Sequence, residues 1–187
     1  MGLIPLIVLF FIAAGLSAYF GTLYNGLVAL RNDIDKAWAN IEVLLKQRHD
    51  ELPRLVAVCQ GYMQYERDTL QRLTEARAKY ASAFTTDQKA LASGAVTASV
   101  QQLFAAAENY PSLKANATFL ELQKRITELE NQIADRREFY NDSINLFNTR
   151  IRQIPDSFVA KTLGLQPRAM FRVSAAERAP VPVAITS

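Results

Sequence analysis

The sequence predicts an all-α protein, in which an N-terminal transmembrane helix leads into an elongated antiparallel bundle or coiled coil of three to four helices. Three observations support this fold class. The stretch Leu3–Val28 contains no Asp, Glu, Lys or Arg. After it, apolar residues recur at intervals of three and four, which places them on one face of a helix. Only 7 Gly and 7 Pro interrupt 187 residues, which is typical of long helices.

The charge-free stretch Leu3–Val28 is long enough to cross a bilayer. A helix rises about 1.5 Å per residue, so roughly 20 apolar residues cross a hydrocarbon core of about 30 Å. A cleaved signal peptide would have a cationic start, a shorter apolar region and a small-x-small cleavage site, and this stretch has no such pattern. We therefore expect a retained transmembrane anchor, in preference to a cleaved signal or a buried core helix.

The basic residues around the anchor predict its orientation. No Lys or Arg precedes the stretch, whereas Arg31, Lys36, Lys46 and Arg48 follow it. Because Lys and Arg near a membrane span favour the cytoplasmic side, we expect a short exported N-terminus and a cytoplasmic body.

One apolar stripe continues from the anchor far along the chain. Its members are Leu27, Leu30, Ile34, Trp38, Ile41, Leu45, Leu52, Leu55, Val56, Cys59, Tyr62, Leu70, Leu73 and Tyr80. No strong stop signal precedes Thr85. The pattern therefore predicts one long helix, continuous with the anchor, kinked near Pro53 and weakened at Gly61.

Two further helices are expected after Thr85. Residues 85–87 supply N-cap side chains for a helix from about Gln88 to Asn109, with Leu91 on its apolar face, and Tyr110–Pro111 ends it. The next helix carries a heptad seam with one stutter after Arg136. The seam consists of Phe119, Leu122, Ile126, Leu129, Ile133, Arg136, Tyr140, Ile144, Phe147, Ile151 and Ile154.

Proline and glycine mark the end of the expected bundle. Pro155 closes the seam, and Asp156–Ser157 could cap a short helix that ends at Gly164. From about Val173 the chain lacks periodicity and is predicted to be disordered. The predicted division is a membrane anchor over 1–30, a helical bundle over 31–172 and a C-terminal tail over 173–187.

The composition predicts no catalytic, cofactor or metal site. The chain has one Cys and one His, and its net charge of +3 comes from interspersed charges of both signs, which argues against nucleic acid as a partner. We expect His49 to be an exposed helix residue and Cys59 a small core residue. Arg136 occupies a seam position. There we favour a side chain whose aliphatic stem reaches out to solvent over a guanidinium that is paired in the core.

Several motifs in the chain resemble the LemA family of bacterial membrane proteins. They are Tyr24-Asn25-x-Leu27-Val28-x-x-Arg31-Asn32, Ala37-Trp38-x-x-Ile41-Glu42, Gln47-Arg48-x-Asp50-x-Leu52-Pro53, Gly61-Tyr62-x-x-Tyr65-Glu66, Tyr110-Pro111-x-Leu113 and Arg136-x-x-x-Tyr140-Asn141. The resemblance covers about Tyr24 to Phe171. Glu42, Tyr65 and Ile154 depart from the Asp, His and Phe that are usual in the family.

The resemblance implies a single N-terminal span in the bacterial inner membrane, followed by an antiparallel helical bundle. It brings no established activity, cofactor or catalytic residue. The residues that it marks are best explained by packing: Tyr24, Asn25, Arg31, Asn32, Trp38, Arg48, Pro53, Gly61, Tyr62, Glu66, Tyr140 and Asn141.

Three classes of function compete. The favoured hypothesis is a non-enzymatic scaffold, anchored in the lipid bilayer, that forms a homo-oligomer and organises or shapes the inner membrane. The alternative is a monomeric adaptor that presents a helical groove to another membrane protein, such as a protease or a signalling protein. An enzyme is disfavoured. Apolar residues off the main stripe are the candidate oligomer interface: Val43, Leu44, Val58, Met63 and Leu146.

Overall fold

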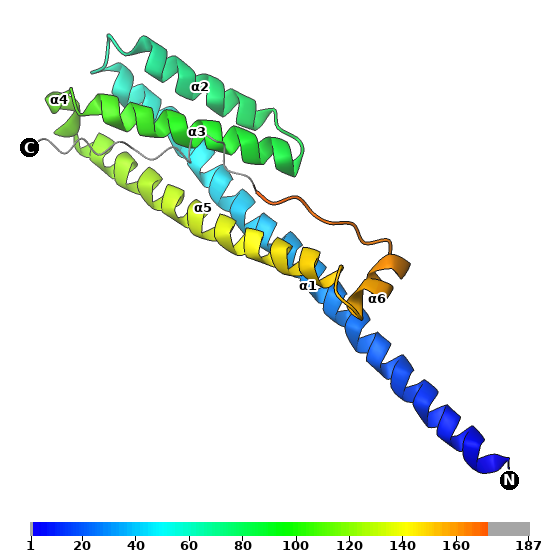
Figure 1. Ribbon diagram of the computed structural model, residues 1–187. Helices are drawn as coiled ribbons and strands as arrows, with labels where there is room; N and C mark the ends of the chain where they lie inside the picture. Colours follow the sequence, from blue (N-terminus) through cyan, green and yellow to red (C-terminus); the bar gives the residue numbers. More distant parts are fainter. Residues whose placement is uncertain (1, 172–187) are drawn as a thin grey trace, which may run out of the picture. The chain divides into compact units, whose positions relative to one another are not determined.

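The computed structural model describes residues 2–171, and the predicted tail over 173–187 lies outside this range. In this range the regular structure is helical, as the sequence predicts. The helices, shown in Figure 1, are α1 (Leu3–Gln60), α2 (Arg67–Ala81), α3 (Thr86–Ala107), α4 (Pro111–Lys114), α5 (Ala117–Arg150) and α6 (Asp156–Thr162). The described residues form two compact units, 2–39 with 138–170 (unit 1) and 40–137 with Phe171 (unit 2).

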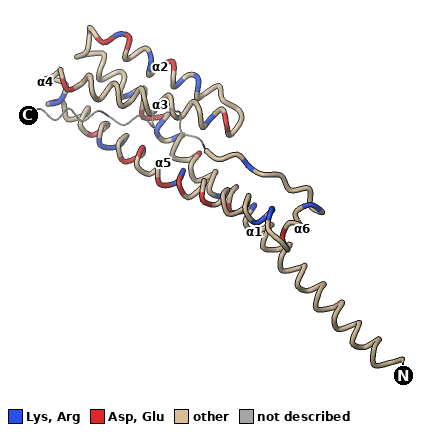
Figure 2. Tube along the Cα trace, in the orientation of Figure 1, with Lys and Arg blue, Asp and Glu red and all other residues tan. Residues whose placement is uncertain are grey.

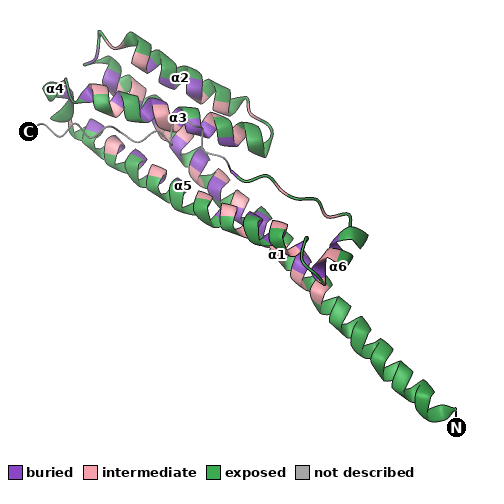
Figure 3. Ribbon diagram, in the orientation of Figure 1, coloured by how far each residue is buried: buried purple, intermediate pink, exposed green. Residues whose placement is uncertain are grey.

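Unit 1 pairs the first part of α1 with the end of α5. Residues 3–22 of α1 are all exposed, and the first partly buried position is Leu23. At about 1.5 Å per residue this free part of the helix is roughly 30 Å long. Figure 3 shows it entirely in the exposed colour. Beyond it, buried apolar residues of the two helices and of the turn after α5 form the core of the unit: Leu27, Ile34, Ala37, Tyr140, Ile144, Phe147 and Ile151.

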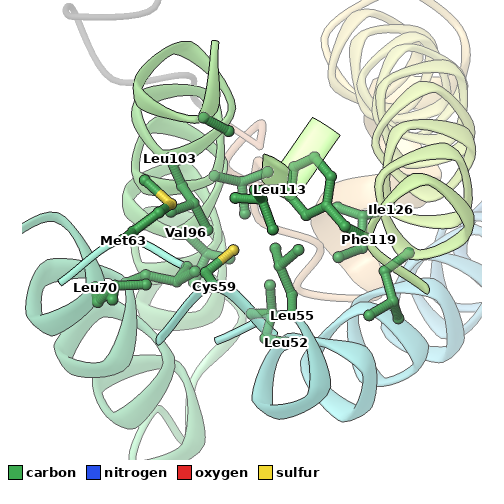
Figure 4. Packing of buried hydrophobic residues seen from close by; sticks show 14 of the residues in the cluster. Leu52, Leu55, Cys59, Met63, Leu70, Val96, Leu103, Leu113, Phe119 and Ile126 are labelled. Carbon is green, nitrogen blue, oxygen red and sulfur yellow. The ribbon is translucent and has the colours of Figure 1, made fainter. Parts of the chain in front are cut away.

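Unit 2 is a four-helix bundle. Its core receives buried residues from α1, α2, α3 and α5, and the short α4 adds Leu113 (Figure 4). The members include Leu52, Leu55, Cys59, Met63, Leu70, Leu73, Val96, Val100, Leu103, Phe119, Leu122 and Ile126. The expected bundle is therefore present.

The expected continuous helix up to Thr85 is wrong. α1 ends at Gln60, and a turn follows in which the amides of Tyr62 and Met63 both donate to the carbonyl of Cys59, at 3.0 and 2.8 Å. Gly61, which was expected only to weaken the helix, lies in this turn. α2 then forms a separate helix that packs on α3. The apolar stripe continues across the break, which is why periodicity alone did not reveal it.

The seam of α5 is shifted near its middle. Arg136 is exposed, which agrees with the expectation that its stem reaches solvent, and Arg137 is the partly buried arginine. The guanidinium of Arg137 lies 4.4 Å from the centre of the Phe171 ring. Ile154, which was expected on the seam, is 77% exposed because α5 ends four residues earlier, at Arg150.

The observed N-cap agrees with the sequence prediction for α3 but not for α6. Thr85 caps α3 as expected, in a capping box with Gln88. For α6, however, Pro155 is the N-cap residue and makes no side-chain cap bond. The Asp156 carboxylate is instead paired with Arg150, at 2.7 Å. Gly164 follows α6 with a φ of 62°, the left-handed conformation that glycine adopts without a steric penalty.

Candidate functional site

A buried arginine forms the centre of the polar site in unit 2. The Arg48 side chain comes from α1 and is 1% exposed. Its Nη1 donates to Glu130 Oε1 at 2.7 Å and to Thr97 Oγ1 at 2.8 Å. Its Nη2 donates to Ser93 Oγ at 2.9 Å and to the Ser93 carbonyl at 3.3 Å. Thr97 Oγ1 in turn donates to Glu130 Oε2 at 2.9 Å.

This Arg48 network ties three helices together. Taking a charged group out of water costs several kcal/mol unless its charge is paired and its donors are bonded. Here the charge of Arg48 is paired with Glu130 of α5, and Ser93 and Thr97 of α3 accept its remaining bonds. The arrangement leaves no free acid, base or nucleophile in the network, so its chemistry fits a structural role.

Sequence reasoning marked Arg48 as a packing residue but missed its partners. Ser93 and Thr97 stand four residues apart in an Ala-rich helix, so they share one face. Glu130 follows the seam residue Leu129 directly. A hydroxyl pair on an otherwise small-residue face was the available signal, because buried hydroxyls need a polar partner.

The family motif around Gly61 lies at the α1–α2 turn. Tyr62 is 39% exposed, and its hydroxyl accepts a bond from Asn116 Nδ2 at 3.1 Å. Glu66 is half-buried, and its carboxylate accepts bonds from the hydroxyls of Thr69, at 3.2 Å, and Tyr110, at 3.5 Å. These bonds hold the turn against the connection between α3 and α5.

The motif residues of unit 1 divide into a packed set and an exposed set. Trp38 is half-buried, and its ring lies 5.7 Å from that of the buried Tyr140, centre to centre. Asn141 is half-buried as well. In contrast, Tyr24, Asn25, Arg31 and Asn32 are exposed, and so is Pro53 in unit 2. Packing within the chain therefore accounts for Trp38, Tyr140 and Asn141 but not for the exposed set.

The single cysteine and the single histidine both lie at least partly inside unit 2. Cys59 is fully buried, as expected, and burial raises the pKa of its thiol to about 11. His49 is half-buried, so the prediction of an exposed residue is wrong, and burial together with the nearby Arg77 charge lowers its pKa. Within residues 2–171, no group of three His, Cys, Asp or Glu side chains could hold a metal ion.

The candidate interface residues differ in exposure. Met63 is 1% exposed in the core of unit 2, so its assignment to a free surface is wrong; the turn after α1 directs it inward. Val43 and Leu146 are 56% and 51% exposed. Leu44 and Val58 are half-buried.

Val58 lies in a groove between α1 and α5 in unit 2. The groove has a volume of about 720 Å³. Acidic, basic and apolar side chains line it, among them Glu51, Arg54, Val58, Leu122, Arg125 and Glu128. A second groove of about 530 Å³, also between α1 and α5, contains Val43, Leu44 and Arg136.

Comparison with known proteins identifies the family. Protein LemA of Metamycoplasma hominis is 28% identical to this chain, over 84% of this chain and 72% of that protein. The magnetosome proteins MamQ 1 and MamQ 2 of Paramagnetospirillum magneticum are each 23% identical, over 88% of this chain and 71% of theirs. The sequence pattern of the LemA family matches residues 37–184, which is most of the chain. The protein therefore belongs to the LemA family.

Proposed function

We propose that this protein is a non-enzymatic scaffold, anchored in the bacterial inner membrane by α1, that self-associates and organises or shapes the membrane. The observation that carries the proposal is the free part of α1. Residues 3–22 bury nothing within the described chain, and a soluble protein rarely leaves so large an apolar surface in water.

A membrane span is supported by the length and composition of α1. Among the described helices, α1 and α3 are both long and apolar enough to cross a membrane. In α3, 39% of the apolar window is buried, and buried residues such as Val96 and Leu103 belong to the core of unit 2. In α1 none of the window is buried, so α1 is the better candidate.

Self-association is supported by apolar side chains that remain exposed outside the anchor. Val43 on α1 and Leu146 on α5 are each more than half exposed. Anchors in one membrane hold many copies at high effective concentration and in one orientation, so weak lateral contacts suffice for assembly. A scaffold also fits the Arg48 network, which is bonded internally. None of the names of the three relatives states a chemical activity.

A cytoplasmic body is the favoured orientation, because Arg31 and Lys36 follow the apolar run closely and no basic residue precedes it. Protease added to intact spheroplasts should leave the body uncut and should digest it after lysis. Digestion from outside would reverse the orientation without affecting the anchor.

The assembly test compares Val43→Glu and Leu146→Glu with the matched control Leu91→Glu. Leu91 is 63% exposed on α3, so the prediction that it lies on the buried face is wrong. Because it is exposed, a charge at this position should not disturb the core. Full-length protein in nanodiscs and in mild detergents should run as a large homo-oligomer. We expect the first two changes to dissociate it and the control to leave it intact, all three with an unchanged helical spectrum.

A full-length protein that runs as a monomer in every one of these media would exclude the scaffold. The second candidate function would then take its place, a monomeric adaptor. The observation that favours it is the groove of about 720 Å³ in unit 2. Its lining includes two acidic residues, Glu51 and Glu128, and two basic residues, Arg54 and Arg125. Mixed charges around an apolar floor suit a helical segment of another membrane protein. For the adaptor, Val58→Glu should abolish capture of that partner, while Leu91→Glu should not.

A further inference from the structure

The short helix α6 lies where α1 leaves the packed part of unit 1. Figure 1 shows it beside α1, near the end of α5. Gly26 marks the level on α1 that the end of α5 reaches, since a Cβ atom there would lie 3.3 Å from Nη1 of Arg150, the last residue of α5. Arg150 is in turn paired with Asp156, the first residue of α6. The free apolar part of α1 ends only one helical turn earlier, at Thr22.

α6 and the turn before it expose two large apolar side chains. Ile154 and Phe158 are 77% and 57% exposed. Ile154 lies in the turn before α6 and Phe158 lies on α6, whereas the buried residues Asp156 and Ala160 hold α6 against the rest of unit 1. Successive helical residues are separated by about 100°, so Phe158 points away from the Asp156–Ala160 side. Nothing in the described chain covers these two large side chains.

Three exposed cations stand near this surface, two in the same segment of the chain and one on α1. Arg152 and Lys161 flank Phe158 in sequence, and Arg31 stands on α1 a little more than one turn beyond Gly26; all three side chains are exposed. Within residues 2–171, no ion pair joins any of them to a carboxylate. The carboxylates nearby in sequence are already engaged: Asp156 with Arg150, Asp33 with Lys36, and Asp35 with Arg168. Figure 2 shows basic residues here and none along the free part of α1.

We propose that Arg31, Arg152, Ile154, Phe158 and Lys161, together the α6 surface, rest on the membrane and bind anionic phospholipid headgroups. The inference rests on the proposed anchoring by α1. If residues 3–22 cross the hydrocarbon core, Gly26 and therefore α6 lie at the headgroup level. Apolar side chains at this level enter the boundary between headgroups and acyl chains, and each nearby Lys or Arg adds attraction to an anionic leaflet.

The segment that carries α6 is attached to the rest of unit 1 at a second place besides the Arg150–Asp156 pair, and this supports the proposal. After α6, the backbone of Arg168 is held by the Asn148 side chain, which donates to its carbonyl at 2.8 Å and accepts from its amide at 2.9 Å. Arg168 also reaches Asp35 of α1, at 2.5 Å. Both ends of the segment that carries α6 are thus fixed to the rest of unit 1, so Ile154 and Phe158 are held out by the fold and not by a loose loop.

The test places a fluorescent probe at the proposed contact in the full-length protein. Phe158→Trp is compared with Phe139→Trp, a matched exchange on α5 of unit 1 at a position that is 56% exposed. Phe139 lies 11 residues before Arg150, about 16 Å farther along the helix from the proposed membrane surface. The native Trp38 is present in both variants. Both are reconstituted into vesicles of phosphatidylcholine with phosphatidylglycerol, with and without lipids brominated in the upper acyl chain.

For Phe158→Trp we expect blue-shifted emission that bromolipids quench more than that of Phe139→Trp. Removing phosphatidylglycerol, or adding Arg152→Gln and Lys161→Gln, should weaken the quenching. Equal quenching of the two Trp variants in protein that floats with the vesicles would overturn the α6 contact and leave the anchor standing. Protein that fails to float would instead refute the anchor. If Phe158→Trp loses the helical spectrum, Ile154→Trp serves as the probe, with the same expectations.

Discussion

Arg48 and Glu130 are joined by an ion pair of 2.7 Å in which one partner is almost fully enclosed and the other reaches the surface. The Arg48 side chain is 2% exposed and that of Glu130 is 19% exposed. Replacing one residue of the pair therefore has a different consequence for the residue that is left. Glu130 can regain water, whereas an unpaired Arg48 would stay enclosed among α1, α3 and α5.

We accordingly predict that Glu130→Gln and Arg48→Met each lower the free energy of unfolding by roughly 3–5 kcal/mol, because each leaves the charge of the other residue without its partner. Arg48→Met should cost less within that range than Glu130→Gln, because the carboxylate that it leaves behind is partly hydrated. The double variant Arg48→Met with Glu130→Leu should recover much of the loss, since an apolar replacement of both partners leaves no buried charge.

Urea unfolding of the full-length protein in a mild detergent measures these free energies. Arg54→Met is the control, because Arg54 is exposed and pairs with Glu51 only at 3.8 Å; exposed pairs contribute about 0–1 kcal/mol. A loss for Arg48→Met no larger than that of the control would show that the Arg48 network does not stabilise the bundle.

Trp38 and Tyr140 give a second test, in unit 1. Truncating a fully buried aromatic residue costs about 3–5 kcal/mol. Trp38 is only half-buried, so we expect Trp38→Ala to destabilise unit 1 by a smaller amount, about 2–3 kcal/mol, and Trp38→Phe to recover most of it. Thermal or urea unfolding followed by circular dichroism gives the values. If Trp38→Ala changes stability by less than about 1 kcal/mol but disrupts the proposed oligomer, Trp38 belongs to a subunit interface.

The positions of the helices could largely be predicted from the sequence, because each depends on local signals. The capping box of Thr85 and Gln88, Tyr110–Pro111 after α3 and Gly164 after α6 act on their immediate neighbours, whereas the short α4 that Pro111 begins was not predicted. The α1–α2 break could not be predicted in the same way. Gly61 is a weak signal by itself, and the turn is stabilised by distant partners, Asn116 for Tyr62 and Tyr110 for Glu66.

The Arg48 network was missed for the same reason. Its bonds join residues 33 to 82 positions apart, and only folding brings them together. A smaller error of prediction concerns the seam of α5, where Arg137 and not the predicted Arg136 is the partly buried arginine. A stutter moves the buried face by one position, and periodicity cannot decide which of two adjacent arginines then points inward.

The thiol of Cys59 should be inert in the folded protein. Burial leaves it no exposed surface and raises its pKa to about 11, and the thiolate is the reactive form. A maleimide or disulfide reagent should therefore label it only after urea unfolds the bundle. Because it is the chain's sole cysteine, the extent of labelling reports directly on local opening of unit 2. Rapid labelling under native conditions would mean that the α1–α2 end of the bundle opens readily.

His49 should make the stability of unit 2 depend on pH. Burial, followed by the nearby Arg77 charge, lowers its pKa in the folded state below the ordinary 6.5, and its Nδ1 has no hydrogen-bond partner within the described residues. Above pH 6.5 the imidazole is neutral in the folded and the unfolded chain, and its contribution to stability is fully present. As the pH falls below 6.5, the unfolded chain takes up a proton that the folded chain resists, so stability decreases until the folded pKa is passed.

The measurement compares the wild type with His49→Gln between about pH 7.5 and 5.5, where carboxylates stay ionised. His49 is the only histidine, so the variant removes the one side chain that ordinarily titrates in this window. We expect the free energy of unfolding of the wild type to fall toward acid pH and that of His49→Gln to stay nearly flat. Parallel curves for the two proteins would show that His49 protonates as easily in the folded bundle as in the unfolded chain. The Tyr80 ring, 5.7 Å from the imidazole, and Arg77, which donates to the His49 carbonyl, would then leave the imidazole open to water.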